Sequence, residues 1–374
     1  MANRTDLNAV LAELGPQFAA RSAELEEDDL FVSENYAQLK QARVFSALVP
    51  ADLGGSAVSH REMCAFLRAL AHHCPSTALS LSMHQHLVAA ARKNHQDGKP
   101  GKMLLEKVGG GELILVSTGA NDWLESHGEA RKVKDGYRVT AVKPFGSGSP
   151  AGDIAVTSCA FDCPEDGPSV IHFPLPLKSE GVKLMDDWRT LGMRATGSQT
   201  MRFEDVFVPE ASVALKRPRG PFHGAFSVIV TVAMPLIMSV YVGVAERAAK
   251  LAREHAAKRK ADPGAALLIG EMENLLTTAQ ITLDSMIALA NDFEFTPSEA
   301  LASQILIRKT VCAKHVIATT EKALEAAGGS GYFRKTGIER LLRDSLAAQF
   351  HPLPEKRQQM FTGRLALGLP PVAA

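Results

Sequence analysis

Cysteine is scarce in this chain of 374 residues, and net charge is absent. The five cysteines form an odd number without framework spacing, which favours a reducing compartment, and we expect a cytoplasmic protein. Lysine plus arginine and aspartate plus glutamate each number 41. The chain therefore produces no long-range field toward nucleic acid or an anionic membrane, and we expect neither as a partner.

Several catalytic motifs are missing as well. The sequence lacks HEXXH, GXSXG, a P-loop and a Cys–His nucleophile pattern, which argues against a hydrolase or a kinase. Cys159 and Cys163 have no second Cys/His pair of metal-ligand spacing, so we expect no metal site. The first residues carry no uninterrupted apolar run, and we expect no signal peptide.

One long apolar stretch is present, AFSVIVTVAMPLIMSVYVGVAE, residues 225–246. Pro235 lies in its middle, and a charged helical pattern follows it at once. We therefore predict a buried core helix here and not a membrane span.

The apolar spacing divides the chain into three parts. Residues 1–112 place apolar side chains three and four apart, as helices do. Residues 113–217 hold short alternating runs broken by Gly, Pro and Asp, which predicts an antiparallel barrel or sandwich with a hairpin at Asp135-Gly136. Residues 218–374 return to long helices with short connections, which predicts an up-and-down bundle. The expected fold class is α+β.

Four loops are rich in small residues. AAGGSGYF (326–333) closes a helix, and its three glycines suit either a helix C-terminus or close approach of a ligand. KPFGSGSPAGD (143–153), GANDW (119–123) and GMRATGS (192–198) fall in the β region near aromatic rings. Backbone N–H groups, hydroxyls and rings together would suit a flat polar ligand.

Two histidines lie two residues apart on a predicted helix, in the segment LSLSMHQHLVAAA. His84 and His86 therefore point to different faces, and at most one of them faces a given pocket. We assign His84 to a substrate pocket, together with Tyr332 beside the glycines.

Four segments resemble the acyl-CoA dehydrogenase superfamily, and the likeness covers nearly the whole chain. They are FSALVPADLGG, DDWRTLGMRATGSQTMRFEDVFVPE, ALEAAGGSGY and IERLLRDS. The resemblance implies an N-terminal helical domain (1–112), a middle antiparallel β-barrel (113–217) and a C-terminal four-helix bundle (218–374). It also implies homodimers or homotetramers, with a flavin between the β domain and the bundle, partly across a subunit contact.

The same resemblance assigns residues to the flavin ring. Ser117 and Thr118 match the loop that meets the flavin. Phe145 and Ser147 match the family's Trp-x-Thr beside the isoalloxazine. The expected cofactor is FAD, with FMN as the alternative.

Further residues match the part of the family's site that binds the flavin tail. Gly328, Gly329 and Gly331 match the glycines that a neighbouring subunit's flavin approaches. Arg259 is what remains of the family's Arg-x-x-Phe motif, with Asp262 where Phe is expected.

The family's catalytic glutamate has no counterpart in either of its two usual positions. The position after the helix that carries Arg-Asp holds Pro352, with His351 before it. The alternative position falls near Ala233 and Met234. His351 becomes the candidate catalytic residue, because an imidazole with a pKa near neutrality can hold or donate a proton.

Three functions remain open. The first is a dehydrogenase that desaturates an acyl thioester, with its base relocated to a residue such as Glu355 or Glu325 and an electron-transfer partner. The second is a monooxygenase that takes reduced flavin from a reductase partner and uses His351 with oxygen. The third is a homologue that binds flavin or acyl groups without turnover.

Overall fold

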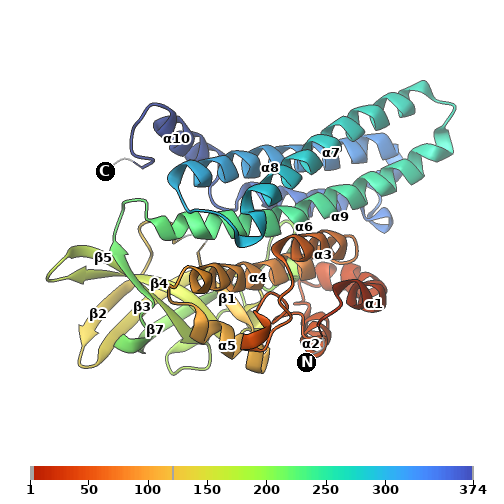
Figure 1. The fold of residues 1–374 in the computed structure, drawn as a ribbon. Helices are drawn as coiled ribbons and strands as arrows, with labels where there is room; N and C mark the ends of the chain where they lie inside the picture. The colour runs from red at the N-terminus through yellow and green to blue at the C-terminus, as the bar shows by residue number, and fades with distance from the viewer. Residues whose placement is uncertain (1–3, 120–121, 373–374) are drawn as a thin grey trace.

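The computed structural model describes residues 4–119 and 122–372 of the chain. Helices come first, then a sheet, then long helices (Figure 1). The N-terminal helices are α1 (Leu7–Glu27), α2 (Ser33–Gln41), α3 (His60–Ala71), α4 (Pro75–Gln96) and α5 (Lys102–Gly111). Ser59 and Glu62 form a capping box at the start of α3, which satisfies two backbone N–H groups there.

The middle part is one sheet of eight strands. The strands are β1 (Leu115–Ser117), β2 (Glu129–Val133), β3 (Gly136–Gly146), β4 (Ile154–Cys163), β5 (Gly167–Pro176), β6 (Val182–Leu184), β7 (Gln199–Pro209) and β8 (Leu215–Pro218). Their order is β6-β7-β3-β2-β4-β5-β8, and β1 pairs with β4. The predicted β2–β3 hairpin is present, with Val133 opposite Gly136.

The prediction of a closed antiparallel barrel was wrong. The terminal strands β6 and β8 do not pair with each other, so the sheet is open, and β1 and β2 both run parallel to β4. Local alternation and turn residues specify hairpins, but they do not determine how strands far apart in sequence pair. The sheet is therefore mixed.

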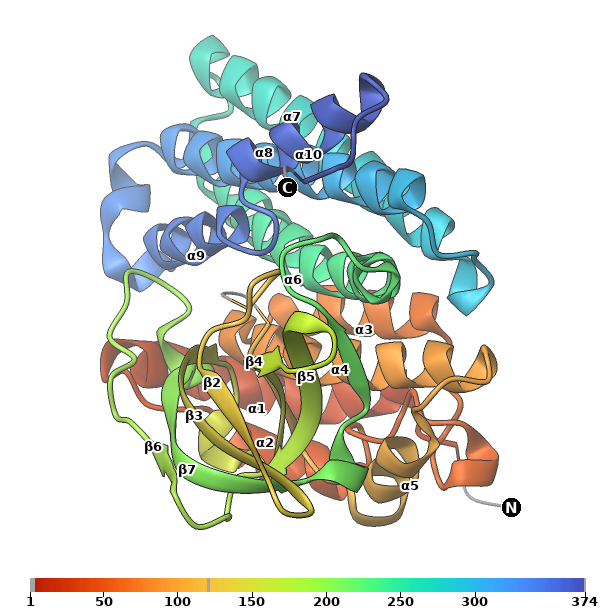
Figure 2. The ribbon, with the colours of Figure 1, turned by 90° about the vertical axis from the view of Figure 1, so that its left-hand side faces the viewer.

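The C-terminal part consists of α6 (Gly224–Ala256), α7 (Pro263–Ala290), α8 (Glu299–Ala327), α9 (Ile338–Ser345) and α10 (Glu355–Ala366). The apolar stretch forms α6, which lies between the N-terminal helices and sheet on one side and the other C-terminal helices on the other (Figures 1 and 2). By length and hydropathy α6 could span a membrane, but nearly all of its apolar window is buried against these layers. It is the central helix of the fold.

Candidate functional site

His351 lies in the turn between α9 and α10, half-buried. Its Nε2 is 2.7 Å from the hydroxyl of Tyr241, which α6 supplies from the centre of the molecule. Burial, with smaller contributions from Lys309 and His86, lowers the pKa of His351 to about 3. The imidazole is therefore neutral at any ordinary working pH.

The Tyr241 contact also selects the tautomer of His351. Burial raises the pKa of Tyr241 well above its ordinary value, so the phenol keeps its proton. Among the described residues this hydroxyl has no other hydrogen-bond partner, so we infer that it donates to Nε2 of the neutral ring and that the ring's own proton lies on Nδ1. His351 consequently has an Nδ1–H group to donate to a ligand.

Lys309 of α8 holds the turn that carries His351. Its side chain is buried, with 1% of the residue exposed. Its ammonium donates to the carbonyls of Gln349, His351 and Leu353 at 3.4, 2.6 and 3.3 Å. Burial lowers the pKa of Lys309 to about 8. Three carbonyls of one turn thus share a single buried cation.

The two helix α4 histidines have different environments. His84 Nε2 lies 2.8 Å from the Phe45 carbonyl, and His84 Nδ1 accepts from the N–H of Leu115 at 2.9 Å. Both nitrogens of His84 lie within hydrogen-bond distance of backbone groups, and the assignment of His84 to a substrate pocket remains a prediction. His86 Nδ1 is buried without a hydrogen bond of normal geometry within the described ranges, although the Ser82 carbonyl is close enough to raise its pKa.

His86 lies near His351. Burial lowers the pKa of His86 to about 4, and His86 in turn contributes to the lowered pKa of His351. An unpartnered buried nitrogen calls for a ligand or a water molecule. His86, rather than His84, is the α4 residue that the structure places beside the candidate site.

The residues matched to the flavin ring lie at the end of β3. Phe145 has a φ of 64° and is 51% exposed, and its ring stands edge-on to Trp188 at 6.0 Å. Ser147 Oγ lies 2.8 Å from Ser198 Oγ, which lies 2.7 Å from the hydroxyl of Thr196. The exposed Phe145 ring and the half-buried Ser147, backed by the buried hydroxyls of Ser198 and Thr196, suit a flat polar group.

This surface is connected to the Tyr241–His351 pair through the loop 192–198. Trp188 Nε1 donates to the Met193 carbonyl at 3.1 Å, and the Met193 N–H donates to Asp344 Oδ1 at 2.6 Å. Asp344 is close enough to Tyr241 to contribute to its raised pKa. The β domain and the turn after α9 thus meet at Asp344.

A second buried carboxylate holds the same loop from the N-terminal side. Glu26 of α1 accepts from the N–H groups of Arg194 and Ala195, both at 3.2 Å, and from the hydroxyl of Ser76. Burial and the neighbouring Glu26 raise the pKa of Asp344 well above its ordinary value. All three parts of the chain therefore position loop 192–198.

Ser117 and Thr118 lie where β1 ends. Ser117 Oγ accepts from the Gly119 N–H at 3.4 Å. Thr118 is buried, and its hydroxyl donates to Thr157 of β4 at 2.9 Å. This hydrogen bond attaches the loop after β1 to β4. Asp122 then pairs with Lys143 of β3 at 2.5 Å, both buried. This ion pair ties the loop after β1 to the strand that carries Phe145.

The residues matched to the flavin tail lie elsewhere in the chain. Arg259 donates to the Ala326 carbonyl at 2.5 Å and packs against Gly328, so Arg259 and the glycines lie together. Gly328 follows Lys309 by 19 residues along α8, which corresponds to about 28 Å. Tyr332 is 81% exposed beside them. The α6–α7 connection that carries Arg259 is at the end of the bundle away from the sheet (Figure 1).

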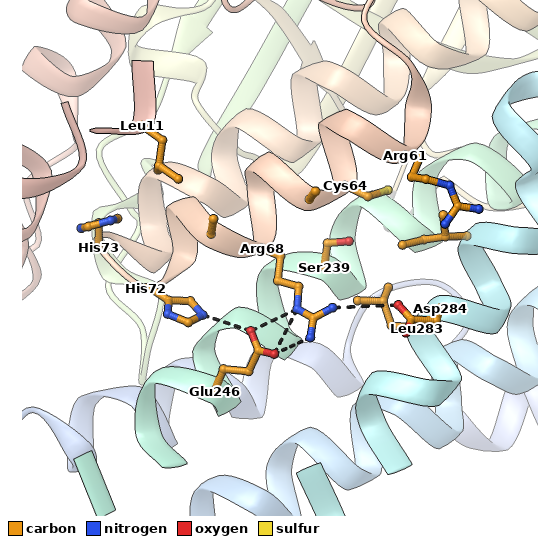
Figure 3. Close-up of a pocket in the computed structure, with 13 residues that line it drawn as sticks. Leu11, Arg61, Cys64, Arg68, His72, His73, Ser239, Glu246, Leu283 and Asp284 are labelled. Atoms are coloured by element: carbon orange, nitrogen blue, oxygen red, sulfur yellow. Dashed lines mark hydrogen bonds and ion pairs between the residues drawn. The ribbon is translucent and has the colours of Figure 1, made fainter. Parts of the chain in front are cut away.

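A cavity of about 500 Å³ lies on the other side of α6 (Figure 3). Ser239 and Glu246 line it, and at 100° per residue both face nearly opposite to Tyr241. The cavity contains none of the residues predicted for the site, and Glu246 pairs there with Arg68 and His72 across the contact between α6 and the α3 segment.

Comparison with protein families gives two matches. Residues 9–96 match the N-terminal domain of acyl-CoA dehydrogenase, and residues 236–355 match its C-terminal domain. The chain belongs to the acyl-CoA dehydrogenase superfamily. It is a flavin-dependent oxidoreductase of that family.

Similar proteins of this superfamily have more than one activity. The amino sugar nitrososynthase RubN8 of Streptomyces rubradiris is 27% identical over 366 residues, covering 90% of this chain and 83% of that enzyme. The cyclohex-1-ene-1-carbonyl-CoA dehydrogenase of Geobacter metallireducens is 22% identical, covering 94% of each chain. FMN-bound TdsC of Paenibacillus sp. A11-2, a dibenzothiophene monooxygenase, has a TM-score of 0.85 at 18% identity, covering 98% of this chain and 99% of TdsC.

Sequence reasoning missed Tyr241, Lys309 and the role of His86. Lys309 carried a signal, because it interrupts an apolar stripe of α8 between Leu306 and Ala313, at helical spacing. A lysine at such a position needs buried acceptors. Tyr241 carried no such signal, since a tyrosine within an apolar core helix is ordinary.

Proposed function

We propose that the chain is a flavin-dependent monooxygenase that receives reduced flavin from a reductase partner. The observation that carries this proposal is the neutral imidazole of His351, which is hydrogen-bonded to Tyr241. His351 directly precedes Pro352, which occupies the position where the resemblance to acyl-CoA dehydrogenases places a glutamate. A neutral His351 with a fixed Nδ1–H group is suited to donating a hydrogen bond to bound oxygen. A base that removes a proton from carbon has a different requirement, which is a pKa near the working pH.

The carboxylates nearby are poorly suited to act as that base. Asp344 accepts from the Met193 N–H, and its raised pKa favours the protonated acid. Glu355 pairs with Lys314 at 2.6 Å, and Glu325 pairs with Lys322 at 2.6 Å. Both are on the surface of the bundle, so neither supports the relocated base that the dehydrogenase hypothesis requires.

The residues present fit a flavin. The exposed Phe145 ring can cover one face of the isoalloxazine, and the hydroxyls of Ser147 and Ser117 can bind its polar edge. The unpartnered His86 nitrogen and the Nδ1–H of His351 supply one acceptor or donor each. When bound, reduced flavin would supply the two electrons that oxygen activation needs.

The chain's own groups have three tasks in this proposal. Tyr241 keeps Nε2 of His351 occupied, so that Nδ1–H donates toward the bound oxygen. Lys309 fixes the turn, and burial, with a smaller contribution from Lys309, keeps the imidazole neutral. Loop 192–198, held by Glu26 and Asp344, orients the β-domain side of the site. These fixed donors need no rearrangement during the reaction.

The comparisons support this proposal. RubN8 is named a nitrososynthase and TdsC a monooxygenase, and the TdsC structure contains FMN. We propose FMN as the cofactor, because Asp262 replaces the aromatic residue expected beside an adenine. We also propose a homodimer or homotetramer; where FAD is bound in place of FMN, Arg259 and the glycines of one subunit approach the tail of its neighbour's flavin.

Dehydrogenation of an acyl thioester is the second candidate. The two family matches and the relative from Geobacter metallireducens favour it. Anaerobic mixing of the oxidised flavoprotein with a panel of acyl-CoA thioesters separates the two functions. The monooxygenase proposal predicts no bleaching of the flavin by any thioester, and rapid bleaching by one of them would establish the dehydrogenase.

The variant His351→Ala tests the role of the imidazole. We expect it to bind FMN with nearly unchanged affinity but to release hydrogen peroxide from reduced flavin and oxygen much faster than the native protein. His84→Ala is unsuitable as a control, because it would remove two backbone contacts. His315→Ala, on the bundle and bonded only to the Val311 carbonyl of its own helix, is the matched control. Equal peroxide release by the native protein and His351→Ala would refute the proposal.

A further inference from the structure

Two buried carboxyl groups accept from consecutive backbone N–H groups of loop 192–198. Asp344 of α9 is 0% exposed and accepts from Met193, while Glu26 of α1 is 3% exposed and accepts from Arg194 and Ala195. Because the three N–H groups are neighbours along the chain, the two carboxyl groups lie close to each other. Two negative charges so close together and out of water would repel strongly, which favours one proton between the two groups.

No cation within the described ranges forms an ion pair with either carboxyl group. Arg343 of α9 pairs with Glu339 at 2.8 Å, and Arg194 of the loop pairs with Asp29 at 3.9 Å. These arginines are therefore engaged with other acids. A buried pair of carboxylates without a cation would cost much free energy, and protonation of one group removes that cost.

The hydrogen bonds indicate which of the two groups carries the proton. Glu26 accepts at both oxygens, from two N–H groups of the loop and from the Ser76 hydroxyl, as an ionised carboxylate does. Asp344 accepts only at Oδ1, and its buried Oδ2 has no partner among the described residues. Burial and Glu26 raise the pKa of Asp344 well above its ordinary value, and the Met193 N–H and the two arginines of α9 offset only part of this rise.

Met193 is held in a strained conformation at this contact. Its φ of 53° and ψ of 36° lie in the left-handed region, which a methionine seldom adopts. Gly192 before it packs against the backbone of α9 too closely for any Cβ atom. The Met193 N–H donates to Asp344 at 2.6 Å, and its carbonyl accepts from Trp188 Nε1 at 3.1 Å and from the Thr196 hydroxyl at 2.9 Å. These three hydrogen bonds offset the cost of the strained conformation.

The two partners of the Met193 carbonyl contact the residues proposed to bind the flavin ring. Trp188 stands edge-on to the Phe145 ring, with 6.0 Å between the ring centroids. Thr196 is linked through one further hydroxyl to Ser147, with 2.7 and 2.8 Å between successive oxygens. A displacement of Met193 would therefore move both the ring that covers the flavin and the hydroxyl that binds its edge.

We propose that Asp344 and Glu26 hold one proton between them, on Asp344, and that the neutral Asp344 is a positioning residue for the flavin ring. This role deepens the proposed function and rests on it in one respect, that the ring lies against Phe145. Ionised Glu26 accepts from two N–H groups of the loop, and Asp344 accepts from Met193 without adding a second buried charge. The loop is thus held from both α1 and α9.

Infrared spectroscopy tests the protonated carboxyl group without flavin or turnover. A protonated carboxyl group has a C=O stretching band that an ionised one lacks. At neutral pH we expect Asp344→Asn to remove one such band from the spectrum of the native protein. Glu339→Gln, which breaks the ion pair with Arg343 on the same helix, should remove none. The absence of this band from the native minus Asp344→Asn difference spectrum would overturn the proposal.

FMN affinity and tryptophan emission test the positioning role. The chain has two tryptophans, so Trp123→Phe leaves Trp188 as the reporter of the Met193 carbonyl. In this background Asp344→Asn should keep the native emission and an FMN affinity within about twofold, because the amide oxygen still accepts from Met193. Glu26→Gln should weaken FMN binding about fivefold or more, because its amide nitrogen cannot accept from the loop.

Two outcomes of the binding measurements would contradict the proposal. Equal losses of FMN affinity in Asp344→Asn and Glu26→Gln would mean that Asp344 is needed as an anion. Asp344→Ala removes the acceptor for Met193, so it should shift the Trp188 emission and weaken FMN binding about tenfold. Native emission and affinity in Asp344→Ala would exclude the positioning role. If Asp344→Ala does not fold, the infrared band and the comparison of Asp344→Asn with Glu26→Gln still decide.

The proton on Asp344 and the monooxygenase function can fail separately. The infrared band and the Trp188 emission are measured on the flavin-free protein, so they do not depend on which reaction the enzyme catalyses. Bleaching of the flavin by an acyl thioester would refute the monooxygenase and leave the band in place. Absence of the band would refute the proton on Asp344 and leave the monooxygenase function standing.

Discussion

Among single residues, Lys309 has the most informative position. It combines burial, a lowered pKa of about 8 and three carbonyl partners in the turn of His351. We predict that Lys309→Met lowers kcat about 100-fold, because the turn loses its shared donor and the imidazole shifts. The His351 pKa, followed by NMR, should rise in this variant, because the nearby positive charge is lost.

The matched control is Lys314→Met. Lys314 is also on α8 but is exposed, and it pairs with Glu355 at 2.6 Å. It should keep nearly full activity and an unchanged His351 pKa. A Lys309→Met protein with native kcat and a native His351 titration would exclude the positioning role.

Lys309 also predicts a pH dependence. Its folded pKa of about 8 lies below the ordinary value of 10.5, so as pH rises past 8 the amine loses its proton in the folded protein first. We expect native activity to fall above pH 8, since the neutral amine binds the three carbonyls more weakly. Stability should change in the opposite direction, rising between pH 8 and 10.5, because the unfolded chain holds the extra proton there. A pH–rate profile and urea unfolding at each pH measure the two effects.

Substitution of Tyr241 should lower kcat less than substitution of Lys309 does. Tyr241→Phe removes the hydroxyl that donates to His351 Nε2 at 2.7 Å. A net hydrogen bond contributes about 1 kcal/mol, so we predict about a fivefold loss of kcat with KM little changed. Steady-state kinetics check this. A loss confined to KM would mean that the tyrosine binds substrate and does not position the imidazole.

Between elements, Glu246 of α6 joins three helices. It accepts from Arg68 of α3 and from His72, the C-cap of α3, at 3.0 Å (Figure 3), and from Gln280 of α7 at 2.6 Å. Burial raises its pKa, but the hydrogen bonds from His72 and Arg68 outweigh that and lower it to about 2. Because the folded pKa is depressed, this stabilisation is present above pH 4.5 and is lost as pH falls toward 2.

The shift from 4.5 to about 2 corresponds to about 3 kcal/mol of unfolding free energy. We predict that Glu246→Gln removes most of this unfolding free energy at neutral pH. The unfolding free energy of the variant should also fall less than that of the native protein as pH decreases from 7 to 2, and urea unfolding at each pH measures this. Glu273→Gln, which breaks the exposed pair with Arg253, should cost less than about 1 kcal/mol. Equal losses in the two variants would contradict the account.

The helices and strands show which parts of the fold could be predicted from the sequence. Helical spacing predicted the terminal helices, and Asp135-Gly136 predicted the β2–β3 hairpin, because both depend on neighbouring residues. The parallel pairing of β1 with β4 and the open edges were missed, because they depend on contacts that no local pattern encodes. The backbone contacts of His84 could not be predicted for the same reason, because the Phe45 carbonyl and the Leu115 N–H come from distant parts of the sequence.

At the scale of the whole molecule, the positions of Arg259 and of Gly328, Gly329 and Gly331 indicate which flavin they can contact. They are about 28 Å along α8 from Lys309, at the end of the bundle away from the sheet. In our proposal they can reach the tail of FAD bound to a neighbouring subunit, a tail that FMN lacks. We predict that Arg259→Ala leaves FMN affinity unchanged and lowers any FAD affinity about tenfold, since only FAD extends to this region. Isothermal titration with both flavins checks it, and equal losses for FMN and FAD would rule out the assignment.

The central claim is that the flavin ring binds between the β domain and the turn after α9, beside His351. A crystal structure of the complex with FMN tests it most directly. The account predicts the isoalloxazine in contact with the Phe145 ring and with Nδ1 of His351, while Tyr241 keeps its bond to Nε2. A ring bound elsewhere, or a His351 side chain turned away from it, would contradict the account.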